Sequence, residues 1–174
     1  MSRFSILALA ATLCAAGCSN DNTPTTPTGP VNKFVFAATL AASNEVPPIT
    51  NAESNANGTA TVTMNTVRDS AGAITSATVD VTATFAGFPA NTVATLAHIH
   101  IGAAGVAGGV VVPMVPAAGE VTFPNGTGSF VKGGFPVTPV DVANQIIANP
   151  GGFYFNVHTG LNPGGAVRGQ LRLQ

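Results

Sequence analysis

The chain contains only three histidines, and their spacing could support metal chemistry. His98 and His100 are one residue apart in the stretch AHIHIG, and His158 follows much later in FYFNVHT. Neutral imidazole is a good ligand for Cu(II) and Zn(II), and three imidazoles with a water in the fourth position are the general form of a catalytic zinc site. One interpretation of these residues is therefore a mononuclear copper or zinc site.

A second interpretation of the histidines is structural. Charged residues make up only 7% of the chain, so imidazoles could serve to satisfy loop carbonyl groups, or one another, through hydrogen bonds. The sequence leaves both interpretations open, and we rank the structural one first.

Both histidine stretches alternate in the way that β-strands do. Residues two apart on a strand share a face, so His98 and His100 lie on one face and Ile99 and Ile101 on the other. In the second stretch large apolar side chains alternate with polar ones, Phe153, Phe155 and Val157 against Tyr154, Asn156 and His158. We expect the apolar sets in the core and all three imidazoles on the outer, polar sides of their strands. There, Tyr154 and Asn156 either orient a histidine through hydrogen bonds or are ordinary polar residues of that face.

Glu45 lies between Asn44 and two prolines, in what should be a rigid loop. It either forms a bidentate, partly buried pair with Arg168 or is an exposed loop carboxylate, and the sequence does not rank one above the other. The last two strands should form a hairpin, which would bring Arg168 or Gln170 near His158. These residues are predicted to support the site, by orientation or by structure, and no catalytic residue is predicted.

Other chemistries find no support in the sequence. There is no Ser-His-Asp order, phosphate loop or CxxC motif, and no evident pair of catalytic carboxylates. The net charge is −1 and the six basic residues are scattered, which argues against binding to nucleic acid.

Glycine and proline punctuate the chain into short segments rich in Val, Thr, Ala and Phe, a pattern typical of an all-β sandwich or barrel. Strands are predicted at 34–40, 58–66, 74–85, 93–101, 110–112, within 119–130, and at 153–159 and 166–173. One helix is predicted at 138–148, with Thr138 as its cap and Pro139 in its first position. The predicted core comprises Ile99, Ile101, Phe153, Phe155, Val157, Leu171 and Leu173.

The N-terminal segment has the features of an export signal. An apolar run follows Arg3 and ends in Ala-Ala-Gly-Cys, which resembles a bacterial lipobox, so residues 1–18 are predicted to be a signal peptide with Cys18 as the lipidated residue. The alternative is an ordinary signal peptide. Residues 19–33 should form a disordered spacer rich in Pro and Thr, and residues 34–174 the folded domain. Ser19 fits sorting to an outer membrane, if the host has one.

Several short motifs occur in an order that resembles the CHRD (chordin) domain family. They are Asn44-Glu45-Val46-Pro47-Pro48, Ala97-His98-Ile99-His100 with a Gly-rich loop, Asn156-Val157-His158-Thr159, Asn162-Pro163-Gly164-Gly165 and Arg168-Gly169-Gln170-Leu171. The resemblance implies an immunoglobulin-like antiparallel β-sandwich or Greek-key barrel, with distant similarity to copper/zinc superoxide dismutase. It implies no established biochemical function.

The dismutase similarity lies in the His-x-His strand with a third histidine on a distant strand. In that enzyme such histidines help to bind copper, and His98, His100 and His158 match them in type and order. A dismutase also needs a bridging histidine and a zinc set, and this chain has no fourth histidine. It therefore cannot build that binuclear centre.

Two classes of function follow. The first is a non-enzymatic extracytoplasmic domain, held in the cell envelope by a lipid anchor, that binds an unidentified protein or glycan. The alternative is a mononuclear copper or zinc protein, either a metal carrier or a redox enzyme, that uses the three histidines.

Overall fold

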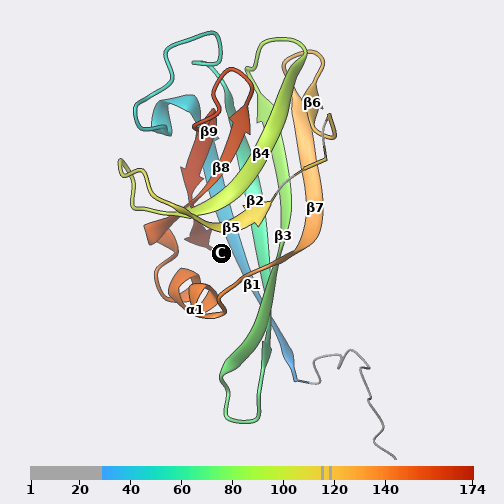
Figure 1. Ribbon diagram of the computed structural model, residues 1–174, viewed down its shortest axis with the longest axis vertical. Helices are drawn as coiled ribbons and strands as arrows, with labels where there is room; N and C mark the ends of the chain where they lie inside the picture. Colours follow the sequence, from blue (N-terminus) through green and yellow to red (C-terminus); the bar gives the residue numbers. More distant parts are fainter. Residues whose placement is uncertain (1–28, 115, 118) are drawn as a thin grey trace, which may run out of the picture.

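A computed structural model describes residues 29–114, 116–117 and 119–174 of the chain (Figure 1). Its strands are β1 (Val31–Ala41), β2 (Asn57–Arg68), β3 (Ile74–Ala86), β4 (Thr92–Ile101), β5 (Val110–Met114), β6 (Thr122–Phe123), β7 (Gly128–Pro136), β8 (Phe153–Thr159), β9 (Val167–Gln170) and β10 (Arg172–Leu173). Its helices are one α-helix, α1 (Asp141–Ala148), and two short 3-10 helices, η1 (Ala42–Asn44) and η2 (Pro150–Gly152).

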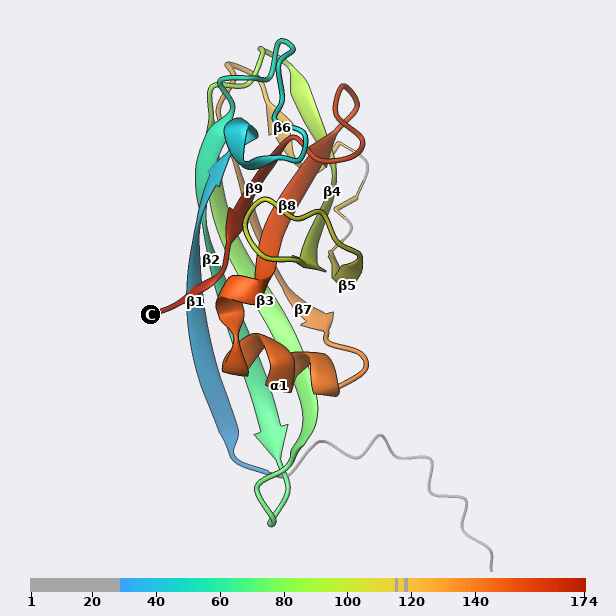
Figure 2. The same cartoon turned by 90° about the vertical axis from the view of Figure 1, so that its left-hand side faces the viewer.

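All the strand pairs are antiparallel, and they form one strongly curved sheet. The strand order is β5-β4-β8-β9-β1-β2-β3-β7, with β10 beside β1 and β6 beside β4. The sheet curls until its edge strands β5 and β7 come into contact, so the described chain is a nearly closed barrel with one short α-helix at its lower end (Figures 1 and 2). This confirms the prediction of an all-β sandwich or barrel.

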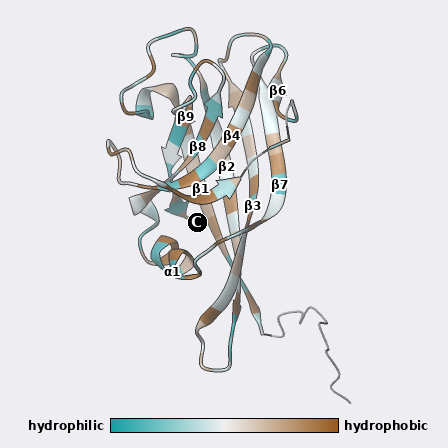
Figure 3. Cartoon of the chain, in the orientation of Figure 1, coloured by the Kyte–Doolittle hydropathy of each residue, from teal (hydrophilic) through white to brown (hydrophobic). Residues whose placement is uncertain are grey.

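The long strands alternate apolar and polar side chains, as the banded hydropathy in Figure 3 shows. Five of the seven predicted core residues are buried: Ile99, Phe153, Phe155, Val157 and Leu171. The predictions for Ile101 and Leu173 are wrong, because these side chains are 45% and 51% exposed. Ile101 keeps its register opposite Phe153 but is the last residue of β4, and Leu173 lies in β10 after a break in the last strand, so each lies where a strand ends or is interrupted.

The helix is shorter than predicted. It begins at Asp141, and Val140 is its N-cap residue without a side-chain cap, so the roles assigned to Thr138 and Pro139 are wrong. The apolar stripe is correct, since Val142 and Ile146 are buried. Its side chains close the barrel interior at that end.

The N-terminal predictions fall largely outside the described residues. The signal peptide, Cys18 and most of the spacer lie within residues 1–28. Strand β1 begins at Val31, three residues before the predicted start, so the end of the expected spacer belongs to the sheet. Within the described residues, no helix is both long enough and apolar enough to span a membrane.

Candidate metal centre

Strand β8 is buried on both of its faces along its whole length. One face packs into the barrel core, and the loops between β1 and β2, β4 and β5, and β8 and β9 cover the other. We call this second surface the covered face, formed by His98, His100, Tyr154, Asn156, His158 and Arg168. The prediction placed the imidazoles on the face away from the core, which is correct. The expectation that this face is an outer, polar one is wrong, because loops bury it.

Strand pairing assembles the covered face. Strand β8 lies between β4 and β9, and Asn156 is directly opposite His98 on one side and Arg168 on the other. Tyr154 is likewise opposite His100 and Gln170. Directly opposed side chains on one face of a sheet are in contact range, so three strands supply one continuous cluster.

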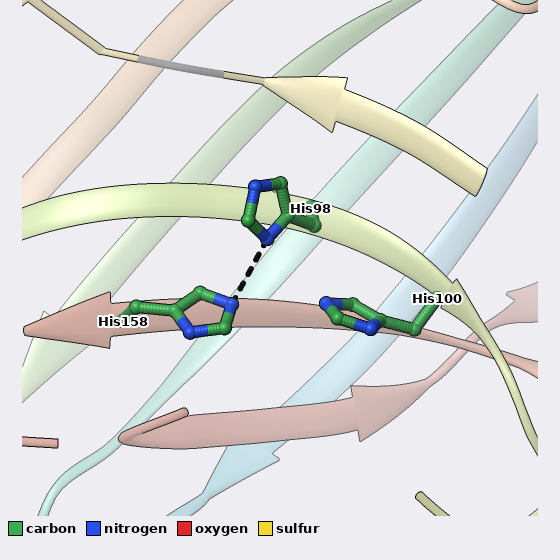
Figure 4. A group of neighbouring side chains, drawn as sticks. All are labelled: His98, His100 and His158. Atoms are coloured by element: carbon green, nitrogen blue, oxygen red, sulfur yellow. Dashed lines mark hydrogen bonds between the residues drawn. The ribbon is translucent and has the colours of Figure 1, made fainter. Parts of the chain in front are cut away.

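The three histidines converge, as predicted (Figure 4). One ring nitrogen from each lies within 4.8 Å of the others. Nδ1 of His98 and Nε2 of His158 are 3.0 Å apart, although the residues are 60 positions apart in sequence. Among the described residues, this is the one group of three or more His, Cys, Asp or Glu side chains arranged to hold a metal.

Backbone carbonyls fix which nitrogen carries the proton in two of the rings. Nδ1 of His158 is 3.0 Å from the carbonyl oxygen of Pro163, and Nδ1 of His100 is 2.9 Å from that of Gly108. A carbonyl oxygen only accepts, so both Nδ1 atoms carry the proton and both Nε2 atoms keep a lone pair. His98 must then donate its Nδ1 proton to Nε2 of His158. Nε2 of His100 is buried and has no partner among the described residues.

All three imidazoles are held in the neutral form. Burial, together with the smaller effects of the neighbouring His158 and His100, lowers the pKa of His98 to about 4. Burial likewise lowers the pKa of His100 and of His158, against the opposing effect of their bonds to Gly108 and Pro163. Neutral rings are the state that a metal ion requires of histidine, and the Nε2 atoms of His100 and His158 each keep a lone pair.

Tyr154 links the histidines to Arg168. Its ring stacks on the His100 imidazole with centroids 4.9 Å apart, and its hydroxyl accepts a hydrogen bond from the Gly108 amide at 3.2 Å. The guanidinium carbon of Arg168 lies 4.5 Å from the same ring centroid. Tyr154 thus packs against a candidate ligand, but its hydroxyl bonds to Gly108 and not to a histidine, so its role in orienting a ligand stays a prediction.

The predicted bidentate pair between Glu45 and Arg168 is wrong. Arg168 is 2% exposed and donates instead to two backbone carbonyls, from Nε to Asn44 at 2.6 Å and from Nη1 to Val106 at 3.1 Å. The Glu45 carboxyl group is also buried but lies beyond salt-bridge distance. Burial raises its pKa from 4.5 to about 7, and the charge of Arg168 offsets only part of this effect.

Gln170 has a structural role at one end of the cluster. Its side-chain amide donates to the carbonyls of Gly102, at 3.0 Å, and Gly151, at 2.8 Å. Because Gln170 is opposite Tyr154, Arg168 is the nearer of the two to His158 along the sheet. Gln170 therefore ties the start of the covering loop to η2 rather than touching His158.

A second buried network was not predicted from the sequence. Glu53 is 1% exposed and accepts hydrogen bonds from Thr159, at 2.8 Å, and from the side-chain amide of Asn162. Asn162 precedes Pro163, whose carbonyl orients His158. The motif Asn-Pro-Gly-Gly marked this loop, but nothing in the sequence paired it with Glu53.

The donor set fits copper or zinc. It contains three imidazole nitrogens and no carboxylate, and imidazole is the ligand shared by zinc and copper sites, whereas carboxylate-rich sites suit magnesium, calcium or manganese. The orphaned Nε2 of His100 points to the same conclusion, because buried polar atoms in folded proteins nearly always have a partner.

Comparison with known protein families supports the family that the order of motifs along the chain suggested. The family model of the CHRD domain matches residues 36–171, which span β1 to Leu171 and so include the whole covered face. No curated protein and no solved structure matches the chain, and the similarity to the dismutase therefore stays a prediction. Since the match covers most of the sequence, the chain belongs to the CHRD domain family.

Proposed function

We propose that this CHRD domain binds one copper or zinc ion through Nδ1 of His98 and the Nε2 atoms of His100 and His158. The observation that carries the proposal is the convergence of three neutral imidazoles, of which one has a buried and unpartnered lone pair. Hydrogen bonding alone accounts for His98 and His158 but leaves Nε2 of His100 unexplained. This reverses the ranking that the sequence suggested.

Binding requires little rearrangement. Ligands about 2.0–2.1 Å from a shared ion lie roughly 3.3–3.6 Å from one another. The nitrogens are already within 4.8 Å, and one pair is at 3.0 Å. His98 would move its proton from Nδ1 to Nε2, which replaces its hydrogen bond to His158 by two bonds to the metal. The carbonyls of Gly108 and Pro163 would continue to orient the other two rings.

The burial of the site favours holding the metal over turning over a bulky substrate. Each histidine is 8% exposed or less, so a bound ion would be shielded from bulk solvent. We therefore propose a non-enzymatic metal-binding role, such as carriage of the ion. Anchoring of the domain in the cell envelope through Cys18 is part of the same proposal and rests on the N-terminal sequence.

The single tyrosine offers a direct test. The chain has one Tyr and no Trp, so its ultraviolet emission comes from Tyr154, which stacks on His100. Addition of Cu(II) to the metal-free protein should quench this emission with a sharp end point at one equivalent. The variant His100→Gln should lose that end point, and Glu120→Gln, which changes an exposed carboxylate, should keep it. A wild-type response without an end point, or one that His100→Gln leaves intact, would overturn the proposal.

A further inference from the structure

The covered face holds more unsatisfied polar atoms than a metal site explains. Four buried side-chain atoms of the described residues have no hydrogen-bond partner: three belong to the covered face and the fourth to Glu45, in the loop between β1 and β2 that covers it. A metal accounts for Nε2 of His100. The other three are Oε1 of Glu45, Oδ1 of Asn156 and Nη2 of Arg168. Each such atom carries a desolvation penalty, so their occurrence together points to a second ligand.

The three groups surround one small region. Asn156 and Arg168 are directly opposed on β8 and β9. A Cβ atom placed on Gly165 would lie 2.6 Å from Nδ2 of Asn156 and 2.8 Å from Oε2 of Glu45, so these two side chains meet above that glycine. The Nε–H of Arg168 bonds to the carbonyl of Asn44, the residue before Glu45.

The charge balance of this region favours an anion. Arg168 is almost fully buried, and no carboxylate among the described residues lies at salt-bridge distance from it. An uncompensated buried charge is unfavourable by several kcal/mol. Glu45 compensates poorly, because its pKa of about 7 leaves it half protonated near neutral pH.

We propose that Arg168, Asn156 and Glu45 bind a small monovalent oxyanion, of the size of formate, nitrite or bicarbonate. Nη2 of Arg168 donates to one oxygen of the anion. The amide of Asn156 can present Nδ2 by a half-turn that exchanges its oxygen and nitrogen, and protonated Glu45 donates its hydroxyl. The site does not require the metal.

A cavity of about 490 Å³ opens beside Glu45, the one residue of the three that lines it. Glu45 is its only acidic lining residue, and the exposed cation Arg172 lines it together with Ser43, Asn44 and Gln170. The cavity is large enough for a small anion, and its one fixed positive charge at the exposed side favours entry of an anion over a cation.

Formate is a suitable probe, and the metal-free full chain is the sample. The Arg168 guanidinium lies against the Tyr154 ring, so formate should change the Tyr154 emission and the ¹⁵N shift of the Arg168 side chain, both with the same saturation curve. Absence of saturation would overturn the proposal and leave water as the partner of these atoms. Because no metal is present, this outcome is independent of the proposed metal function.

Two variants locate the site. Asn156→Asp puts a negative charge beside Arg168 and should weaken formate binding by at least about ten-fold, because like charges at this separation repel strongly in a buried setting. Asn125→Asp makes the same change in the exposed turn between β6 and β7 and should have no effect. Equal affinities for the two variants would contradict the proposal.

Glu45→Gln provides a second test of the anion site in case Asn156→Asp does not fold. Wild-type affinity for formate should fall as the pH rises from 6 to 8, as Glu45 loses its proton beside Arg168, the charged group that acts on it. The amide variant cannot ionise and should bind formate equally across this range. A fall of the same size in both proteins would remove Glu45 from the site and overturn the proposal.

Discussion

Glu45 and the three histidines respond to pH in opposite directions, because burial favours the neutral form of each. The pKa of His98 is lowered from 6.5 to about 4, so the unfolded chain takes up the proton first as the pH falls, and stability is lost below about 6.5. The pKa of Glu45 is raised from 4.5 to about 7, so the folded chain holds its proton longer, and stability is lost as the pH rises from 4.5 through 7. The metal-free domain should therefore be less stable at both ends of this range.

Glu45→Gln should isolate the second effect. At pH 4 the variant and the wild type should unfold at the same denaturant concentration, because both side chains are neutral. At pH 8 the variant should be more stable by on the order of 2–3 kcal/mol, since it no longer places a carboxylate in a buried site. Urea denaturation of the metal-free protein in formate-free buffer measures this difference.

The exposed acid Glu120 provides the control for that experiment. It pairs with Lys132 at 2.7 Å, and this contact lowers its pKa, so Glu120→Gln should give no gain in stability at pH 8. A gain of similar size in both variants would show that general charge, and not burial of Glu45, sets the pH dependence.

At the scale of elements, the loop between β8 and β9 positions His158 from outside the strand. Glu53 accepts hydrogen bonds from Thr159, the last residue of β8, and from Asn162 in the loop. The carbonyl of Pro163, the next residue, accepts a hydrogen bond from Nδ1 of His158. A carboxylate 105 residues away in sequence from a candidate ligand thereby controls its orientation through two hydrogen-bonded residues. We expect Glu53 to be a positioning residue of the metal centre.

Glu53→Ala tests this role, because it removes Oε2, the one oxygen that accepts from both Thr159 and Asn162. We expect Zn(II) affinity to fall about ten-fold, the lower end of the effect seen when groups behind metal ligands are changed. In the metal-free variant, the ¹⁵N shifts of His158 should show a mixture of tautomers in place of the Nδ1–H form. Reduced stability with unchanged affinity and an unchanged tautomer would mean that Glu53 supports the fold alone.

How far the sequence could predict the site depended on the kind of element. Alternation along the strands correctly paired His98 with His100 and placed His158 on the matching face, because a strand fixes side-chain direction at every second residue. It failed at Ile101, the last residue of β4, and at Leu173, which follows a break in the last strand. Loops follow no such period, so neither the burial of the covered face nor the link from Glu53 to Asn162 could be predicted.

The unpredictable course of the loops also explains why the sequence suggested the wrong partner for Arg168. Charge alone suggested Glu45, because few other acids compete for it. The covering loops, however, bring the backbone carbonyls of Asn44 and Val106 to the guanidinium. Every residue has a backbone carbonyl, so the sequence does not indicate which of them will accept a hydrogen bond. A prediction from side chains alone therefore identified the right residues but assigned them the wrong contact.

At the scale of the whole molecule, the proposed anchoring would depend on the segment before β1. We predict that Cys18→Ser moves the protein from the membrane fraction to the soluble extracytoplasmic fraction, because the proposed lipid is attached to that thiol. Mass spectrometry of the wild-type N-terminus should find a lipidated cysteine as the first residue. Membrane fractionation that is identical for the variant and the wild type, together with an unmodified N-terminus, would contradict anchoring through Cys18.

The order in which the chain is made bears on when the ion can enter. Asn44 and Arg168 exchange hydrogen bonds across 124 positions. His98 on β4 and His158 on β8 are 60 positions apart, so these two strands can pair only after the segment between them has been synthesised. Until residues 167–170 have been synthesised, β9 cannot pair with β1 and the loops cannot close over the histidines. The proposed ion therefore has no complete site on the nascent chain before β9 has been made.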